Sequence, residues 1–234
     1  MKVQATGLRS RDIFNNVKGK YDGRYGKNAG IVITQSYLRL QSAALATQST
    51  IDFAVLINEL APGASTVDPS EKRLALVDNF LITEMRISLL KVATGDTSAV
   101  STLNQFPNEY KFTGSGEAKN LMNIYNGFLT TTINGEVILD SWDISRHYRV
   151  GTAQEGLAAS ANATVNLYAA DNYDSASYGF YPVTPQIELR GNAKNRLRIN
   201  LPANVSLAGT SSTNYAILEV RGLLVQNGSA IAQR

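Results

Sequence analysis

Beyond residue 30, apolar residues recur in short runs whose spacing predicts β-strands. Apolar and polar residues alternate in 51–57 and in 196–201, so the apolar side chains of each run would share one face of a strand. Longer runs rich in β-branched residues predict further strands at 31–40, 79–92 and 214–225. A helix can also be drawn over 79–92, but its β-branched residues favour a strand.

Local signals place one hairpin and one helix. The pair Asn134-Gly135 separates two apolar runs, 128–133 and 136–139, and predicts a tight hairpin because both turn positions need a positive φ. The single convincing helix is predicted over 116–125, where apolar residues form one stripe.

Several strands are expected to be irregular. A bulge is predicted near Met85, and another at Gly222 in the last strand. Pro182 and Pro185 lack a backbone N–H, so the strand over 180–189 cannot pair as a central strand before Gln186.

The pattern predicts an all-β fold, either a Greek-key sandwich or a jelly roll, with about nine or ten strands and one short helix. An up-and-down barrel would show evenly spaced hairpins, whereas only residues 128–139 form a tight one. Long polar connections at 59–71, 93–115 and 169–185 suit strands that cross between two sheets. We therefore expect a single β-sandwich domain over 31–234.

Residues 1–30 differ from the rest of the chain in charge. They hold seven basic and two acidic residues, a formal charge of +5, and the whole chain is +3, so residues 31–234 sum to −2. Five glycines disfavour a long regular element, so we predict an extended basic arm with at most a short helix around 9–16. The arm residues expected to contact a neighbour or a polyanion are Lys2, Arg9, Arg11, Lys18, Lys20, Arg24 and Lys27.

Three roles are open for this arm. Ile13, Phe14, Tyr21 and Tyr25 give it apolar surface to bury, which favours a tether to another protein over a disordered tail. Aromatic rings interleaved with basic residues are also typical of segments that bind single-stranded nucleic acid.

Little in the sequence points to catalysis. The chain has no cysteine and one histidine, His147, and it lacks phosphate-binding and nucleophile-elbow motifs. On a strand, Asp143, Ser145 and His147 would share one face, although a histidine hydrogen-bonded beside Trp142 is the simpler interpretation. Residues 171–174 have the acidic character of a calcium loop without EF-hand spacing. We predict a chain that is not an enzyme, with no catalytic, cofactor-binding or metal-binding residue.

Three glutamates on predicted strands each precede an arginine by two positions, which puts both side chains of each pair on the same face. Such pairs predict polar sheet faces, turned to solvent or buried between subunits. The pairs are Glu84 with Arg86, Glu188 with Arg190, and Glu219 with Arg221.

An alternative function rests on aromatic residues in the second half of the chain. Trp142, Tyr173, Tyr178 and Tyr181 could form a contact patch. Under this hypothesis the chain is a carbohydrate-binding or adhesive sandwich module of a fibre, spike or decoration protein.

In its layout and in three stretches, the chain resembles virus capsid proteins, most of all those of bacteriophages. The layout combines a basic glycine-rich arm, no cysteine, 18% charged residues and long polar loops. The stretches are KRLALVDNFLITEMRISLLKV, YNGFLTTTINGEVILDSWDISRHYRV and GFYPVTPQIELRGNAKNRLRINLP.

This resemblance implies a self-assembling structural protein of an icosahedral virion, assembled in the host cytoplasm. Its partners would be copies of itself, as a trimer or capsomer, and other virion proteins. The arm would contact a neighbour, the genome or an internal membrane, and there would be no small-molecule substrate.

Overall fold

The structure is a computed structural model of the 234-residue chain. The part of the chain that it describes comprises residues 3–25, 31–55, 74–93, 103–107, 109, 111–149, 179–209 and 212–229. The predicted connection at 59–71 and the first ten residues of the one predicted at 169–185 lie outside these ranges.

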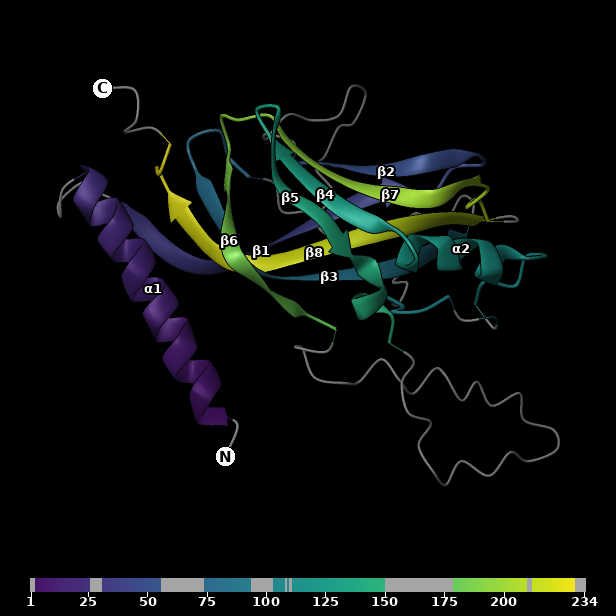
Figure 1. Cartoon of the computed structure of the whole chain (residues 1–234), viewed down its shortest axis with the longest axis horizontal. Coiled ribbons are helices and arrows are strands. Elements are labelled where there is room, and N and C mark those ends of the chain that lie inside the picture. Colours follow the sequence, from purple (N-terminus) through teal and green to yellow (C-terminus); the bar gives the residue numbers. More distant parts are fainter. Residues whose placement is uncertain are drawn as a thin grey trace.

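The described body is an all-β sandwich of two four-stranded sheets (Figure 1). Its strands are β1 (Val32–Ala43), β2 (Gln48–Ala54), β3 (Asn79–Ala93), β4 (Phe128–Ile133), β5 (Glu136–Asp143), β6 (Tyr181–Arg190), β7 (Asn195–Val205) and β8 (Ser212–Gln226). The first sheet has the order β1-β8-β3-β6, and the second has the order β2-β7-β4-β5. All neighbouring strands are antiparallel, as the predicted sandwich requires.

The strands pair in a nested order. β1 pairs with β8, β2 with β7, β3 with β6 and β4 with β5. The innermost pair is the predicted hairpin, and its turn residues Asn134 and Gly135 have φ of 51° and 91°. Successive pairs in this order fall in alternate sheets.

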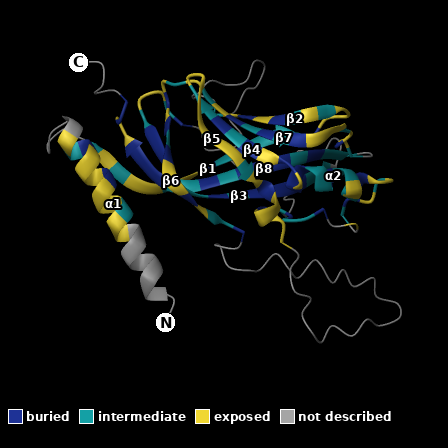
Figure 2. Ribbon diagram, in the orientation of Figure 1, coloured by how far each residue is buried: buried dark blue, intermediate teal, exposed yellow. Residues whose placement is uncertain are grey.

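The core lies between the two sheets and follows from their alternating patterns. Ile51 and Phe53 on β2 are each 1% exposed, and Leu197 and Ile199 on β7 are fully buried. Figure 2 shows the buried residues concentrated between the sheets. The first sheet contributes Phe80, Ile82, Met85, Ile87, Leu89, Leu218 and Val220 to the same cluster.

Prolines and a bulge act as the sequence predicts, with one shift in position. β6 carries Pro182 and Pro185 and is an edge strand of the first sheet. The register between β3 and β8 shifts between Ile82 and Glu84, so the bulge predicted near Met85 is present, with Thr83 as its extra residue. The predicted bulge at Gly222 is wrong. Gly222 pairs with Ile82 next to the register shift, but the extra residue lies on β3 and not on β8.

Two α-helices lie at opposite ends of the sandwich (Figure 1). The predicted helix is α2 (Glu117–Tyr125), whose buried Leu121, Ile124 and Tyr125 join the core. The prediction of an extended arm is wrong, because most of the N-terminal segment is the helix α1 (Val3–Tyr25). Gly19 and Gly23 lie exposed on it, while packing of its apolar stripe stabilises the helix.

Candidate functional site

Helix α1 packs against the outer surface of the first sheet. Its stripe Ile13, Val17 and Tyr21, spaced four residues apart, meets Leu81 of β3 and Leu223 of β8. Val17 is 4% exposed and Tyr21 is 2% exposed. We call this contact, completed by Val225, the α1 dock.

A polar node fixes the orientation of α1 in the dock. Glu188 of β6 accepts hydrogen bonds from Lys20 Nζ at 2.6 Å and from Tyr21 Oη at 2.9 Å. Asn79 Nδ2 donates to Tyr21 Oη at 2.9 Å and to Glu188 Oε1 at 3.1 Å. Burial raises the pKa of Glu188, but the hydrogen bonds from Lys20 and Tyr21 and the charges of Lys20 and Arg190 outweigh it and hold this pKa below its usual value.

The basic arm residues therefore divide into two groups. Lys20 is engaged by the chain's own Glu188, whereas Arg11 and Lys18 are exposed on α1. Lys2 and Lys27 lie outside the described residues, and α1 includes Arg9 and Arg24, whose side chains are not described.

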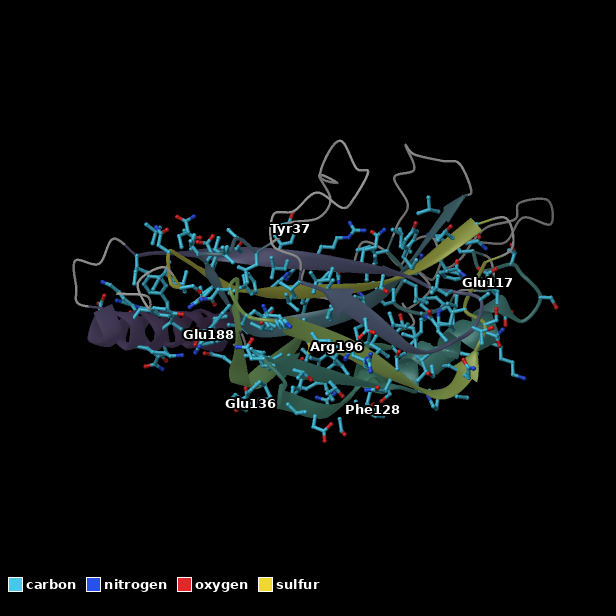
Figure 3. All side chains as sticks on the ribbon, turned by 90° about the horizontal axis from the view of Figure 1, so that it is seen from above. Tyr37, Glu117, Phe128, Glu136, Glu188 and Arg196 are labelled. Atoms are coloured by element: carbon cyan, nitrogen blue, oxygen red, sulfur yellow. The ribbon has the colours of Figure 1, made fainter. Side chains whose placement is uncertain are left out.

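Beside the α1 dock, a groove of about 690 Å³ runs over the outer face of the first sheet. Ile13 of α1 lines one side, Leu223 and Gly222 contribute apolar surface, and Phe180 lines it from just before β6. The remaining lining residues come from β1, β3 and β8: Gln35, Ser36, Tyr37, Arg39, Thr83, Glu84, Glu219 and Arg221. Tyr37, at 52% exposed, lies on the side of the molecule opposite Phe128 and Glu136 (Figure 3).

Strand register arranges five polar side chains of the groove, together with the neighbouring Arg86, in two rows. One row is Tyr37, Arg221 and Glu84, and the next is Arg39, Glu219 and Arg86. Charges of opposite sign therefore alternate across neighbouring strands, a stabilising arrangement on a sheet face. The predicted polar face exists, but Arg86 pairs across strands with Glu219, with Nε to Oε2 at 2.7 Å.

Two arginines of the groove, Arg39 and Arg221, form no salt bridge with a described residue, although each faces a glutamate on the neighbouring strand. Arg39 Nε is buried and lacks a hydrogen-bond acceptor. The Arg221 guanidinium lies 3.7 Å from the centroid of the Phe180 ring, and Arg86 lies 4.5 Å from it. Burial lowers the pKa of Arg221 and the charge of Arg86 lowers it further, while the charges of Glu84 and Glu219 oppose this shift.

The surroundings of the single histidine are those of a structural residue. His147 is fully buried at the end of a 3-10 helix, Ile144–His147, where its Nε2 accepts from Trp142 Nε1 at 3.0 Å and its Nδ1 lies 3.2 Å from the Gly179 carbonyl oxygen. Ser145 Oγ donates to Asp143 Oδ2 at 2.7 Å. Both ring nitrogens of His147 are thus engaged, and the serine pairs with the aspartate instead of the histidine.

Only part of the predicted aromatic patch falls within the described residues. Trp142 and Tyr181 both contact the His147 ring, with centroid separations of 6.3 Å and 5.3 Å. The Arg146 guanidinium lies 4.3 Å from the Trp142 ring centroid and covers it. Tyr173 and Tyr178 lie outside the described residues, as does the acidic loop at 171–174.

The environment of His147 predicts a pH-dependent stability. Burial lowers its pKa from 6.5 to about 4, and the charge of Arg146 adds to the effect, while the Gly179 carbonyl and Asp143 oppose it. Because the unfolded chain takes up a proton that the folded chain refuses, stability falls as pH drops from about 6.5 towards about 4. Between pH 7.5 and 5 we expect a loss of about 2 kcal/mol, measured by urea unfolding.

The matched variant for this prediction is His147→Gln. It should be less stable than the parent at pH 7.5 but should lose little further stability by pH 5. Equal pH dependence in the parent and the variant would assign the effect to other groups.

No protein-family model matches the chain, and a search of the curated proteins found no match. In the described residues, no cluster of three or more histidine, aspartate or glutamate side chains is placed to hold a metal ion. No helix in that part of the chain has the length and apolar character to cross a membrane.

Proposed function

We propose that this chain is a self-assembling structural protein of a virion, a bacteriophage capsid subunit, with a jelly-roll body. The nested strand pairing carries the proposal. Eight strands in two sheets, paired first with last through to the central hairpin, are what coiling a single hairpin into a jelly roll produces. Jelly rolls occur in viral capsid and lectin domains and in cupins.

The interior of the sandwich favours a structural role over ligand chemistry between the sheets. Large apolar side chains such as Phe53, Phe80 and Phe112, each at most 1% exposed, fill the space between the sheets. Carbohydrate binding by the predicted aromatic patch would use an exposed Trp142 ring, whereas Arg146 packs against this ring and its indole N–H donates to His147. These observations favour the capsid-like function over the carbohydrate-binding alternative.

Exposed apolar residues on two edge strands supply candidate contacts between subunits. Val137 and Ile138 of β5 are 58% and 48% exposed, and Val32 of β1 is 49% exposed. Edge strands with such surface are ready to pack against another chain. In this proposal repeated copies of weak contacts give a stable shell through their number.

The α1 helix takes the role that the sequence assigned to an extended arm. Docked on its own body, it presents Arg11 and Lys18 to a neighbouring subunit or to the genome. The contact it makes in the assembly is then that of a positioned helix instead of a flexible strand.

Particle size tests this function. Light scattering and negative-stain microscopy of the purified full chain should show closed shells or defined oligomers. A chain lacking residues 1–28 should remain β-rich by circular dichroism and assemble poorly. A full chain that stays monomeric at high concentration and over a range of salt would contradict the proposal, and normal shells from the truncated chain would contradict the role of α1.

A further inference from the structure

We propose that the groove on the outer face of the first sheet binds an acidic peptide segment, whose carboxylate is held by Arg39 and Arg221. This binding is separate from self-assembly and does not depend on it. The occupant is defined by its chemistry: a short chain with a carboxylate and neighbouring apolar side chains.

The two arginines are placed to act together. Arg39 faces Glu219 across the β1–β8 pair, and Arg221 lies two residues further along β8. Side chains in this diagonal relation are about 7–8 Å apart at their bases, within reach of long side chains that converge on one group. A guanidinium binds a carboxylate through parallel N–H donors, and both Arg39 and Arg221 line the groove.

The neighbouring charges decide between a carboxylate and a polyanion. Arg86 is already paired with Glu219, which leaves Arg39, Arg221 and Glu84 as the groups that set the charge seen by a ligand. Their sum is +1, which matches one carboxylate. Glu84 would repel a second phosphate of a nucleic acid, and it can accept the backbone N–H groups of a peptide.

The apolar residues that line the groove would contact the apolar side chains of the peptide. Leu223 and Ile13 lie on the side of the groove towards α1, and Phe180 and Tyr37 supply aromatic surface. A volume of about 690 Å³ falls within the range of roughly 300–1,000 Å³ found for ligand sites. It therefore accommodates a few residues, of which one is acidic and its neighbours are apolar.

Fluorescence anisotropy with the full chain tests this binding. The probe is a fluorescein-labelled eight-residue peptide with one central glutamate among leucine and serine residues, and the same peptide with glutamine in place of that glutamate is the matched ligand control. Arg39→Gln and Arg221→Gln should each weaken binding of the glutamate peptide at least about tenfold. Arg39→Lys should retain part of the affinity, because it keeps the charge and loses the forked donors.

The control variant is Arg196→Gln, which removes the same charge from the second sheet. Arg196 pairs with Asp52 at 2.9 Å, outside the groove, so its loss should leave peptide affinity unchanged within about twofold. Melting temperatures of all variants establish that each is folded.

Three results would overturn the proposal. The first is equal affinity for the glutamate and glutamine peptides. The second is peptide binding that both groove variants leave unchanged. The third is tighter binding of an oligothymidylate or of inorganic phosphate than of the peptide through the same arginines, which would identify the groove as a site for phosphates.

Discussion

Replacing Gly222 by alanine is expected to destabilise the fold by about 3 kcal/mol or more. Gly222 lies on β8, a central strand of the first sheet, beside the bulge at Thr83 of β3. A Cβ atom at this position would overlap the carbonyl oxygen of Leu81, which belongs to the backbone and cannot rotate away. Relief requires that β3 and β8 move apart, which breaks packing on both faces of the sheet. Urea unfolding followed by circular dichroism measures the loss.

Gly19→Ala is the matched control because it makes the same chemical change where space is open. No atom lies within 4 Å of a Cβ built on Gly19, which is exposed on α1. Alanine there should leave the stability unchanged or raise it by up to about 1 kcal/mol. If Gly222→Ala proved as stable as Gly19→Ala, the close approach of the two central strands would be wrong.

The parts of the fold that depend on local chemistry could be predicted from the sequence. Asn134-Gly135 determines a hairpin because few other residues adopt two successive positive φ values, and the structure contains that turn. Pro182 and Pro185 restrict their strand to an edge because each removes a donor, and β6 is an edge strand. In both places a few adjacent residues decide the structure by themselves.

The helix α1 could not be predicted in this way. Each glycine within it costs up to about 1 kcal/mol relative to alanine, so local propensity predicts an irregular segment. What stabilises the helix is the contact of Val17 and Tyr21 with Leu81 and Leu223, residues far away in the sequence. Ile13, Val17 and Tyr21 at intervals of four were the one available signal, and the glycines obscured it.

The groove could not be predicted from the sequence, for a related reason. The sequence shows that Glu84 and Arg86 share a face, and the simplest expectation pairs arginine with a glutamate on the same strand. The structure pairs Arg86 with Glu219, 133 residues away, because β3 lies beside β8 in a register that only the complete sheet defines. The same register places Arg39 and Arg221 on neighbouring strands of the groove, and no local pattern in β1 or β8 reveals it.

The second large effect is expected from Val17→Asp, which should release α1 from the sheet. Val17 is 4% exposed among Leu81, Leu223 and Val225, so a carboxylate there would lose its hydration without a partner. Burying an unpaired charge costs several kcal/mol of free energy. The small apolar contact between α1 and the sheet stabilises the docked helix by less than this, so the helix should leave the sheet. Hydrogen–deuterium exchange followed by mass spectrometry should show the amides of α1 exchanging at least about tenfold faster.

Phe14→Asp introduces the same charge change on the same helix and is the control. Phe14 is 37% exposed, so its aspartate variant keeps a hydrated carboxylate and should leave exchange in α1 near that of the parent. Exchange in β7 should be unaffected in both variants, since that strand belongs to the second sheet. Equal exchange in the two helix variants would mean that the apolar stripe does not hold α1, and the helix could then not act as a positioned contact in an assembly.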